Sequence, residues 1–146
     1  MPEHPSATGL EQMQAIVDGR APAAPIQDLL SFDLVEAAPG RAVFVCTPTE
    51  QMANPMGSVH GGVAMTLLDS AAGAAVHTTL AAGEGYATLE TKVNLVRGIT
   101  AQTGAVRAEG TVVHRGKRVA TAEGRLTDAA GKLLAHATST CLILGG

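Results

Sequence analysis

One carboxylate in this chain is notable for the residues around it. From residue 63 to 82 the sequence is almost wholly apolar, and Asp69 is the only residue there with a formal charge. His77 is the one other ionisable group in the run. An isolated carboxylate in apolar surroundings is costly unless it is hydrogen bonded or used in chemistry. Asp69 is therefore a candidate nucleophile or general base, and the alternative is a structural carboxylate held by Thr66, Ser70 or the backbone.

The residues just before this run favour a backbone that can bind a ligand. His60, Gly61 and Gly62 stand where the apolar run would begin as a helix. The first turn of a helix has unpaired N–H groups at the positive end of the helix dipole, and glycine allows a ligand to approach closely. The Gly61 N–H is thus a candidate donor to a carbonyl oxygen that becomes an oxyanion. Alternatively, the two glycines only permit a tight turn. We interpret His60 as a hydrogen-bonding residue that orients the loop, because it has no metal-binding spacing with other residues.

The spacing of these two groups has a geometric consequence. Gly61 and Asp69 are eight residues apart, which is about 12 Å along a helix axis. A carbonyl whose oxygen is bound at Gly61 cannot also present its carbon to an Asp69 that far away. If both groups act on one carbonyl, they must come from different chains. The spacing then predicts a homodimer with two equivalent sites at a two-fold interface.

Length and composition indicate one globular domain. The chain has 146 residues, of which 46% are hydrophobic and 16% charged, and its formal net charge is -3. We expect a helix and linker over residues 1–25 and a single domain over 26–146. The two cysteines, Cys46 and Cys141, have no metal or redox spacing. Three aromatic residues and no excess of basic residues argue against a nucleic-acid partner.

The sequence gives no sign of export or of a membrane span. The first 20 residues include Glu3, Glu11 and Asp18 and lack the apolar core of a signal peptide. The apolar run is rich in Ala and Gly and is interrupted by Asp69 and His77, which argues against a transmembrane helix. We therefore expect a cytoplasmic protein that does not enter a membrane.

The periodicity of the sequence predicts an α+β fold. Thr8 and Glu11 resemble a capping box at the start of a helix that would end near Arg20. Another helical turn is expected over 26–30 and a long helix over 62–80. Strands are expected over 33–38, 41–47, 86–96, 102–114, 118–128 and 133–144. Small residues recur on one face of two consecutive strands, at Ala108, Gly110, Ala120, Ala122 and Gly124. About six antiparallel strands would thus wrap closely around one long central helix.

These residues also resemble a known family. The stretch 54–70, NPMGSVHGGVAMTLLDS, resembles the signature of the hotdog-fold acyl-CoA thioesterases of the phenylacetate-pathway (PaaI-like) type. The stretches 88–97, TLETKVNLVR, and 137–144, ATSTCLIL, are also similar to that family. The resemblance covers roughly residues 26–144 and implies a hotdog fold, although that fold hosts several activities.

The resemblance implies a role for each matching residue. Asp69 would be the catalytic carboxylate and Gly61 would supply the oxyanion N–H. Asn54 would help to place the water or the carboxylate, and His60 would support the thioester end of the site. Thr88 would supply a hydroxyl that assists water. The family uses no metal, needs no cofactor beyond the coenzyme A of its substrate, and forms dimers that commonly pair into tetramers.

Further residues are candidates for substrate contacts. Gly62, Met65, Val93 and Asn94 are expected near the bound substrate. The phosphates of coenzyme A need cationic partners, for which the turn containing Arg115 and Lys117 is a candidate. The alternative is that residues 115–118 form an ordinary solvated turn.

The favoured function is hydrolysis of an acyl-CoA thioester, with aryl or phenylacetyl groups as candidate acyl groups. A hydratase or dehydratase would need a His–Glu or Asp–His pairing, for which the sequence offers no motif. A non-catalytic acyl-CoA-binding protein is the third reading. The set Asn54, His60, Gly61 and Asp69 argues against it, because a protein that only binds has no need of all four.

Overall fold

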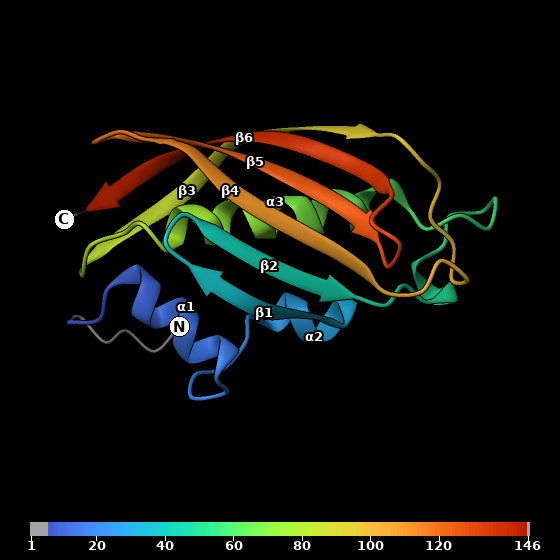
Figure 1. Cartoon of the computed structure of the whole chain (residues 1–146), viewed down its shortest axis with the longest axis horizontal. Coiled ribbons are helices and arrows are strands. Elements are labelled where there is room, and N and C mark those ends of the chain that lie inside the picture. The colour runs from blue at the N-terminus through green and yellow to red at the C-terminus, as the bar shows by residue number, and fades with distance from the viewer. Residues whose placement is uncertain (1–5, 146) are drawn as a thin grey trace.

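A six-stranded antiparallel sheet wraps around one long helix in a computed structural model that describes residues 6–145. The strand order is β1-β2-β4-β5-β6-β3, so that β1 and β3 form the two edges. Figure 1 shows the strands crossing over α3, with α1 and α2 beside β1. The elements are α1 (Gly9–Val17), α2 (Pro25–Leu30), β1 (Phe32–Ala38), β2 (Arg41–Cys46), the short 3-10 helix Glu50–Met52, α3 (Gly61–His77), β3 (Glu84–Leu95), β4 (Val106–Arg115), β5 (Val119–Asp128) and β6 (Leu133–Gly145). The predicted α+β architecture is confirmed.

The predicted elements are present, but some of their ends differ. The capping box of Thr8 and Glu11 is confirmed, yet α1 ends at Val17 because Gly19 adopts a left-handed conformation with φ of 75°. Strand β4 begins at Val106 and not at residue 102. The hydroxyl of Thr103 accepts a hydrogen bond from the Thr100 N–H, at 3.0 Å, and turns the chain before the strand.

The depth of α3 in the sheet depends on small residues. The predicted stripe of Ala108, Gly110, Ala120, Ala122 and Gly124 is buried on the face that meets α3. A β-carbon at Gly110 would collide with the backbone carbonyl of Ala71, and one at Gly124 would lie 3.0 Å from a methyl group of Leu68. The helix backbone therefore rests almost directly on the sheet backbone at Gly110.

The beginning of α3 is held by a side chain. His60 is the N-cap residue, and its Nδ1 accepts a hydrogen bond from the Gly62 N–H at 2.9 Å. The His60 carbonyl accepts from the Val63 N–H at 2.9 Å. His60 thus orients the loop and the helix start, as predicted from the sequence.

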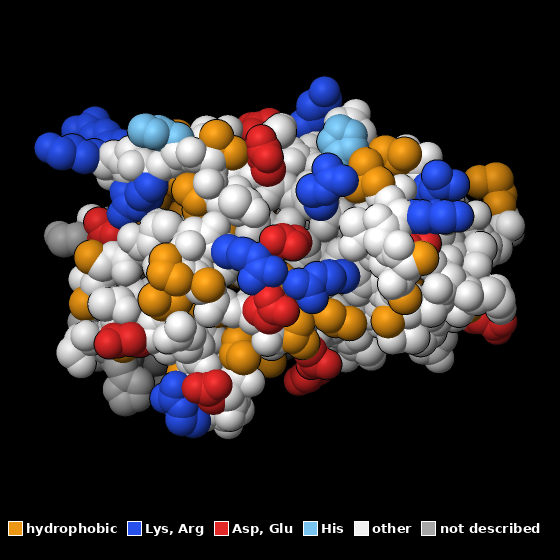
Figure 2. Space-filling view, viewed as in Figure 1, with side chains coloured by type: hydrophobic (Ala, Val, Ile, Leu, Met, Phe, Trp, Pro, Cys, Tyr) orange, Lys and Arg blue, Asp and Glu red, His pale blue; other side chains and the backbone are white. Residues whose placement is uncertain are grey.

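The outer face of the sheet carries alternating charges, which Figure 2 shows over its middle. Arg41 pairs with Glu36 at 2.7 Å and with Glu109 at 2.8 Å, and Arg107 pairs with Glu36 at 3.3 Å. The hydrogen bond from Arg41 holds the pKa of Glu36 below its ordinary value. Within residues 6–145, no helix is long and apolar enough to cross a membrane.

Replacing Gly110 by alanine should destabilise the fold. The added methyl group meets the Ala71 carbonyl, so α3 and β4 must move apart, and we expect a loss of about 2–3 kcal/mol in the free energy of unfolding. Gly98→Ala is the matched control, because no atom lies within 4 Å of a β-carbon there and its φ is not positive. Urea denaturation of both variants measures the difference. Equal midpoints would show that Gly110 does not set the helix position.

Replacing the cap residue tests the role of His60 in stability. His60→Ala leaves the Gly62 N–H without its acceptor and should lower the free energy of unfolding by about 1 kcal/mol. His60→Asn supplies another good capping side chain and should recover most of that loss. Thermal unfolding measures both variants, and an unchanged midpoint for His60→Ala would contradict a capping role.

Candidate active site

Asp69 lies on the exposed stripe of α3 and is held by two threonines of β3. Its Oδ1 accepts hydrogen bonds from the hydroxyls of Thr88, at 3.1 Å, and Thr91, at 3.3 Å. The expected partners Thr66 and Ser70 are wrong. The Thr66 hydroxyl instead donates to the Gly62 carbonyl, because that carbonyl lies one helical turn before it. Asp69 is exposed in the single chain, so the carboxylate has no burial to compensate.

A bulge in β3 explains why both threonines reach Asp69. Residues three apart on a regular strand point to opposite faces. The pairing with β6 shifts between Thr88, which faces Cys141, and Glu90, which faces Thr140. Leu89 is the extra residue and is 58% exposed. The bulge therefore turns Thr88 and Thr91 toward the same side of the strand. Thr91 was missed from the sequence, since a bulge has no clear signal there.

The second group of predicted residues gathers at the start of α3. Among residues 6–145, the Gly61 N–H has no hydrogen-bond acceptor, so it can donate to a ligand. The Oδ1 of Asn54 accepts from the N–H groups of Met56, at 3.0 Å, and Ser58, at 3.1 Å. Asn54 thus shapes the loop that leads into the helix.

A surface depression of about 230 Å³ lies beside the Gly61 N–H. It is lined by Asn54, Ser58, Val59, His60, Gly61, Ala64, Leu95, Val96, Arg97, Gly98 and Ile99. The loops on its two sides are joined by a hydrogen bond from the Val59 N–H to the Ile99 carbonyl, at 2.7 Å. Arg97 is the basic residue of this lining, and sequence reasoning placed it only among several cations.

The structure does not bring Gly61 and Asp69 together within one chain. Both lie on the continuous helix α3, eight residues apart, and the helical rise separates them by about 12 Å. The single chain therefore contains two incomplete groups, one with the free N–H at Gly61 and one with the carboxylate at Asp69.

The other predicted contact residues are distributed over both faces of the site. Met65 is exposed on α3 beside Asp69, and Asn94 is exposed near the end of β3, whereas Val93 packs against the hydrophobic core. Gly62 is held by His60, since a β-carbon there would lie 2.9 Å from the His60 Nδ1.

The predicted basic turn lies at the other end of α3. The Arg115 guanidinium donates to Glu84, at 2.8 Å, and to Thr79, at 3.1 Å, just after the helix ends. Arg115 is thus already paired within the chain, while Lys117 is exposed in the turn. A contact of either residue with coenzyme A stays a prediction. In the part of the chain that is described, no group of three or more His, Cys, Asp or Glu side chains could hold a metal ion.

Comparison with known proteins identifies the family. Residues 56–135 match the Thioesterase superfamily, which is more than half of the chain. A 1,4-dihydroxy-2-naphthoyl-CoA hydrolase of Listeria monocytogenes is 29% identical over 118 residues, covering 81% of this chain and 94% of that protein.

Solved structures agree with this match. A phenylacetic acid degradation-related protein of Ralstonia eutropha is 28% identical, with a TM-score of 0.80 over 89% of this chain and 98% of that one. The PaaI protein of Escherichia coli is 22% identical, with a TM-score of 0.82 over 95% of this chain and 98% of that one, which shows the shared fold. The chain therefore belongs to the Thioesterase superfamily and is a hotdog-fold acyl-CoA thioesterase.

Proposed function

We propose that Asp69 is the reacting carboxylate in the hydrolysis of an acyl-CoA thioester to the free acid and coenzyme A. The observation that carries this proposal is the setting of Asp69. Thr88 and Thr91 both bind Oδ1, so they fix the carboxylate while Oδ2 receives no hydrogen bond from the described side chains. An oriented carboxylate with one free oxygen on an exposed helix face is suited to attack a carbonyl or to take a proton from water.

The chemistry follows one of two routes. As a general base, Asp69 removes a proton from water while the water oxygen attacks the thioester carbon. The carbonyl oxygen gains negative charge, which the Gly61 N–H stabilises, and the C–S bond then breaks to release the thiolate. As a nucleophile, Asp69 first forms a mixed anhydride and releases the thiolate, and water then hydrolyses the anhydride. Both routes need Asp69 and Gly61 at the same carbonyl.

The site is therefore proposed to lie between two copies of the chain. One copy supplies the carboxylate of Asp69 and the other supplies the N–H of Gly61, because about 12 Å separates the two within a chain. Exposed apolar side chains next to Asp69 support this arrangement, since Met65 is 45% exposed and Leu89 is 58% exposed. A second chain packed on this face would bury them.

The acyl group is proposed to be aromatic. The Listeria relative is named for a naphthoyl-CoA substrate, and two of the matching structures are named for phenylacetic acid degradation. A non-catalytic acyl-CoA-binding protein is the competing function. It is disfavoured because the Asp69 carboxylate and the free Gly61 N–H are both retained in an accessible geometry.

Release of free thiol from a panel of aryl and aliphatic acyl-CoAs tests this function. Asp69→Asn and Asp69→Ala should lower kcat by roughly 10²–10⁴ relative to the unmodified protein, because the proton acceptor or nucleophile is lost. Asp33→Asn is the control, since Asp33 is an exposed carboxylate on β1 away from the site. Full activity of Asp69→Ala would contradict the assigned role, and tight binding without turnover by the unmodified protein would favour the binder.

A further inference from the structure

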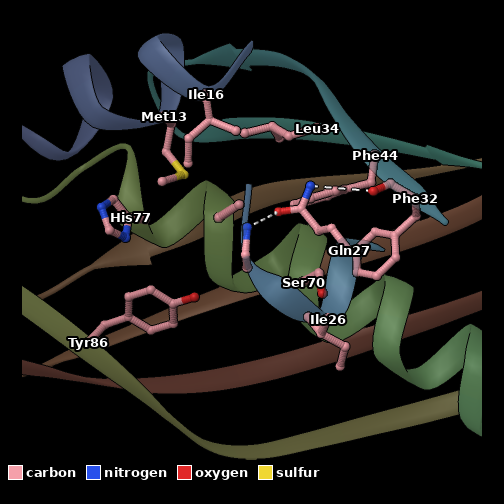
Figure 3. Close-up of a pocket in the computed structure, with 12 residues that line it drawn as sticks. Met13, Ile16, Ile26, Gln27, Phe32, Leu34, Phe44, Ser70, His77 and Tyr86 are labelled. Atoms are coloured by element: carbon pink, nitrogen blue, oxygen red, sulfur yellow. Dashed lines mark hydrogen bonds between the residues drawn. The ribbon is translucent and has the colours of Figure 1, made fainter. Parts of the chain in front are cut away.

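A second hollow lies beside α3, on the far side of Asp69 from Gly61. Figure 3 shows its lining, which comes from the N-terminal helices, the first two strands and α3. Its volume is about 190 Å³. The lining residues are Met13, Ile16, Ala24, Ile26, Gln27, Phe32, Leu34, Phe44, Ser70, Ala74, His77 and Tyr86. Most of this wall is apolar, so the cavity is suited to a hydrophobic group with few polar atoms.

Tyr86 reaches the cavity across α3 because the helix has a glycine below it. A β-carbon at Gly73 would collide with the Tyr86 hydroxyl and would lie 3.0 Å from the ring carbon that carries it. Glycine inside a helix is less stable than alanine by about 1 kcal/mol, so Gly73 has a local cost that the position of Tyr86 explains. The Tyr86 ring also packs edge-on against His77, with ring centroids 5.8 Å apart.

The hydroxyls of Tyr86 and Ser70 have no hydrogen-bond partner among residues 6–145. A buried tyrosine hydroxyl usually has such a partner. Figure 3 shows the Tyr86 hydroxyl pointing into the hollow, with Ser70 facing it from α3. Gln27, by contrast, is already bonded to the Phe32 carbonyl and the Ala24 N–H. The cavity thus offers two free hydroxyls within an apolar wall.

The cavity is close to the proposed reaction centre. Ser70 follows Asp69 directly, and Gly73 lies one helical turn after Asp69, at a rise of about 6 Å. Burial, together with the charge of Asp69, raises the pKa of Tyr86 to about 12, so the hydroxyl stays protonated and can donate. An acyl group whose carbonyl is at Asp69 can therefore extend along α3 into this hollow.

We propose that Tyr86 is a specificity-determining residue, whose hydroxyl, together with Ser70, binds a polar substituent of an acyl group held in this cavity. The inference rests on the proposed function and names its substrate class more closely. A cavity of 150 Å³ accepts benzene, so about 190 Å³ fits one substituted ring. The expected substrates are single-ring acyl groups with a hydroxyl on the ring, and a fused naphthoyl group is too large.

A matched pair of substrates tests this role. We expect the unmodified protein to have a higher kcat/KM for 4-hydroxyphenylacetyl-CoA than for phenylacetyl-CoA. Tyr86→Phe keeps the ring and removes only the hydroxyl, and should lower the ratio of the two values roughly three- to tenfold, mainly through KM. Thr111→Val removes an exposed hydroxyl from β4 and should leave the ratio unchanged. A Tyr86→Phe variant with the ratio of the unmodified protein would overturn the inference.

A binding measurement separates this inference from the proposed function. Tyr86 is the only tyrosine in the chain, so isotope-labelled tyrosine gives a single side-chain NMR signal. Addition of 4-hydroxyphenylacetate should shift that signal more than phenylacetate does. A shift without turnover of any acyl-CoA would contradict the proposed function while supporting the pocket. Turnover with no shift from either acid would overturn the pocket alone.

Discussion

The contact between α3 and β4 at Gly110 controls where every other group of the site lies. The helix backbone at Ala71 rests on the strand at this glycine, and Gly124 lets Leu68 pack nearly as closely on β5. Since α3 cannot move outward without losing this contact, its opposite face is fixed relative to β3. That face carries Asp69, which Thr88 and Thr91 can then reach from the edge strand.

Helix α3 also orders the three parts of the site along one axis. Its first residue presents the Gly61 N–H, its middle presents Asp69, and its next turn presents Gly73 beneath Tyr86. One rigid element therefore fixes the spacing of the oxyanion donor, the carboxylate and the cavity. The eight residues between Gly61 and Asp69 are the reason that a complete site needs a second chain.

Much of this arrangement could be predicted from the sequence. The alternation of Ala108 and Gly110 with polar residues predicted a sheet that lies close to a helix, and the structure has Gly110 at that contact. Hydrophobic periodicity and the turn at Pro39 and Gly40 predicted the long helix and the hairpin, because these depend on local spacing. The signature from Asn54 to Asp69 predicted the family, which the comparison confirms.

The side-chain partners could not be predicted in the same way. The bulge at Leu89 depends on the register between β3 and β6, residues that lie about 50 positions apart in the chain, and it decides that Thr91 reaches Asp69. The pairing of Arg115 with Glu84 and the packing of Tyr86 on Gly73 likewise arise only when distant segments meet. A single sequence specifies such tertiary contacts only through the folded chain.

Mixed dimers test the central claim, that one site combines Asp69 of one chain with Gly61 of another. Asp69→Ala lacks the carboxylate, and Gly61→Pro lacks the N–H while proline is tolerated at the first position of a helix. Gly61→Ala, which keeps the N–H, is the control for crowding against Leu95. Each of the two defective variants should be inactive alone, and equal amounts allowed to exchange subunits should regain about a quarter of full activity, since half of the dimers then hold one intact site. No recovery, with subunit exchange demonstrated by mass, would contradict a site shared between two chains.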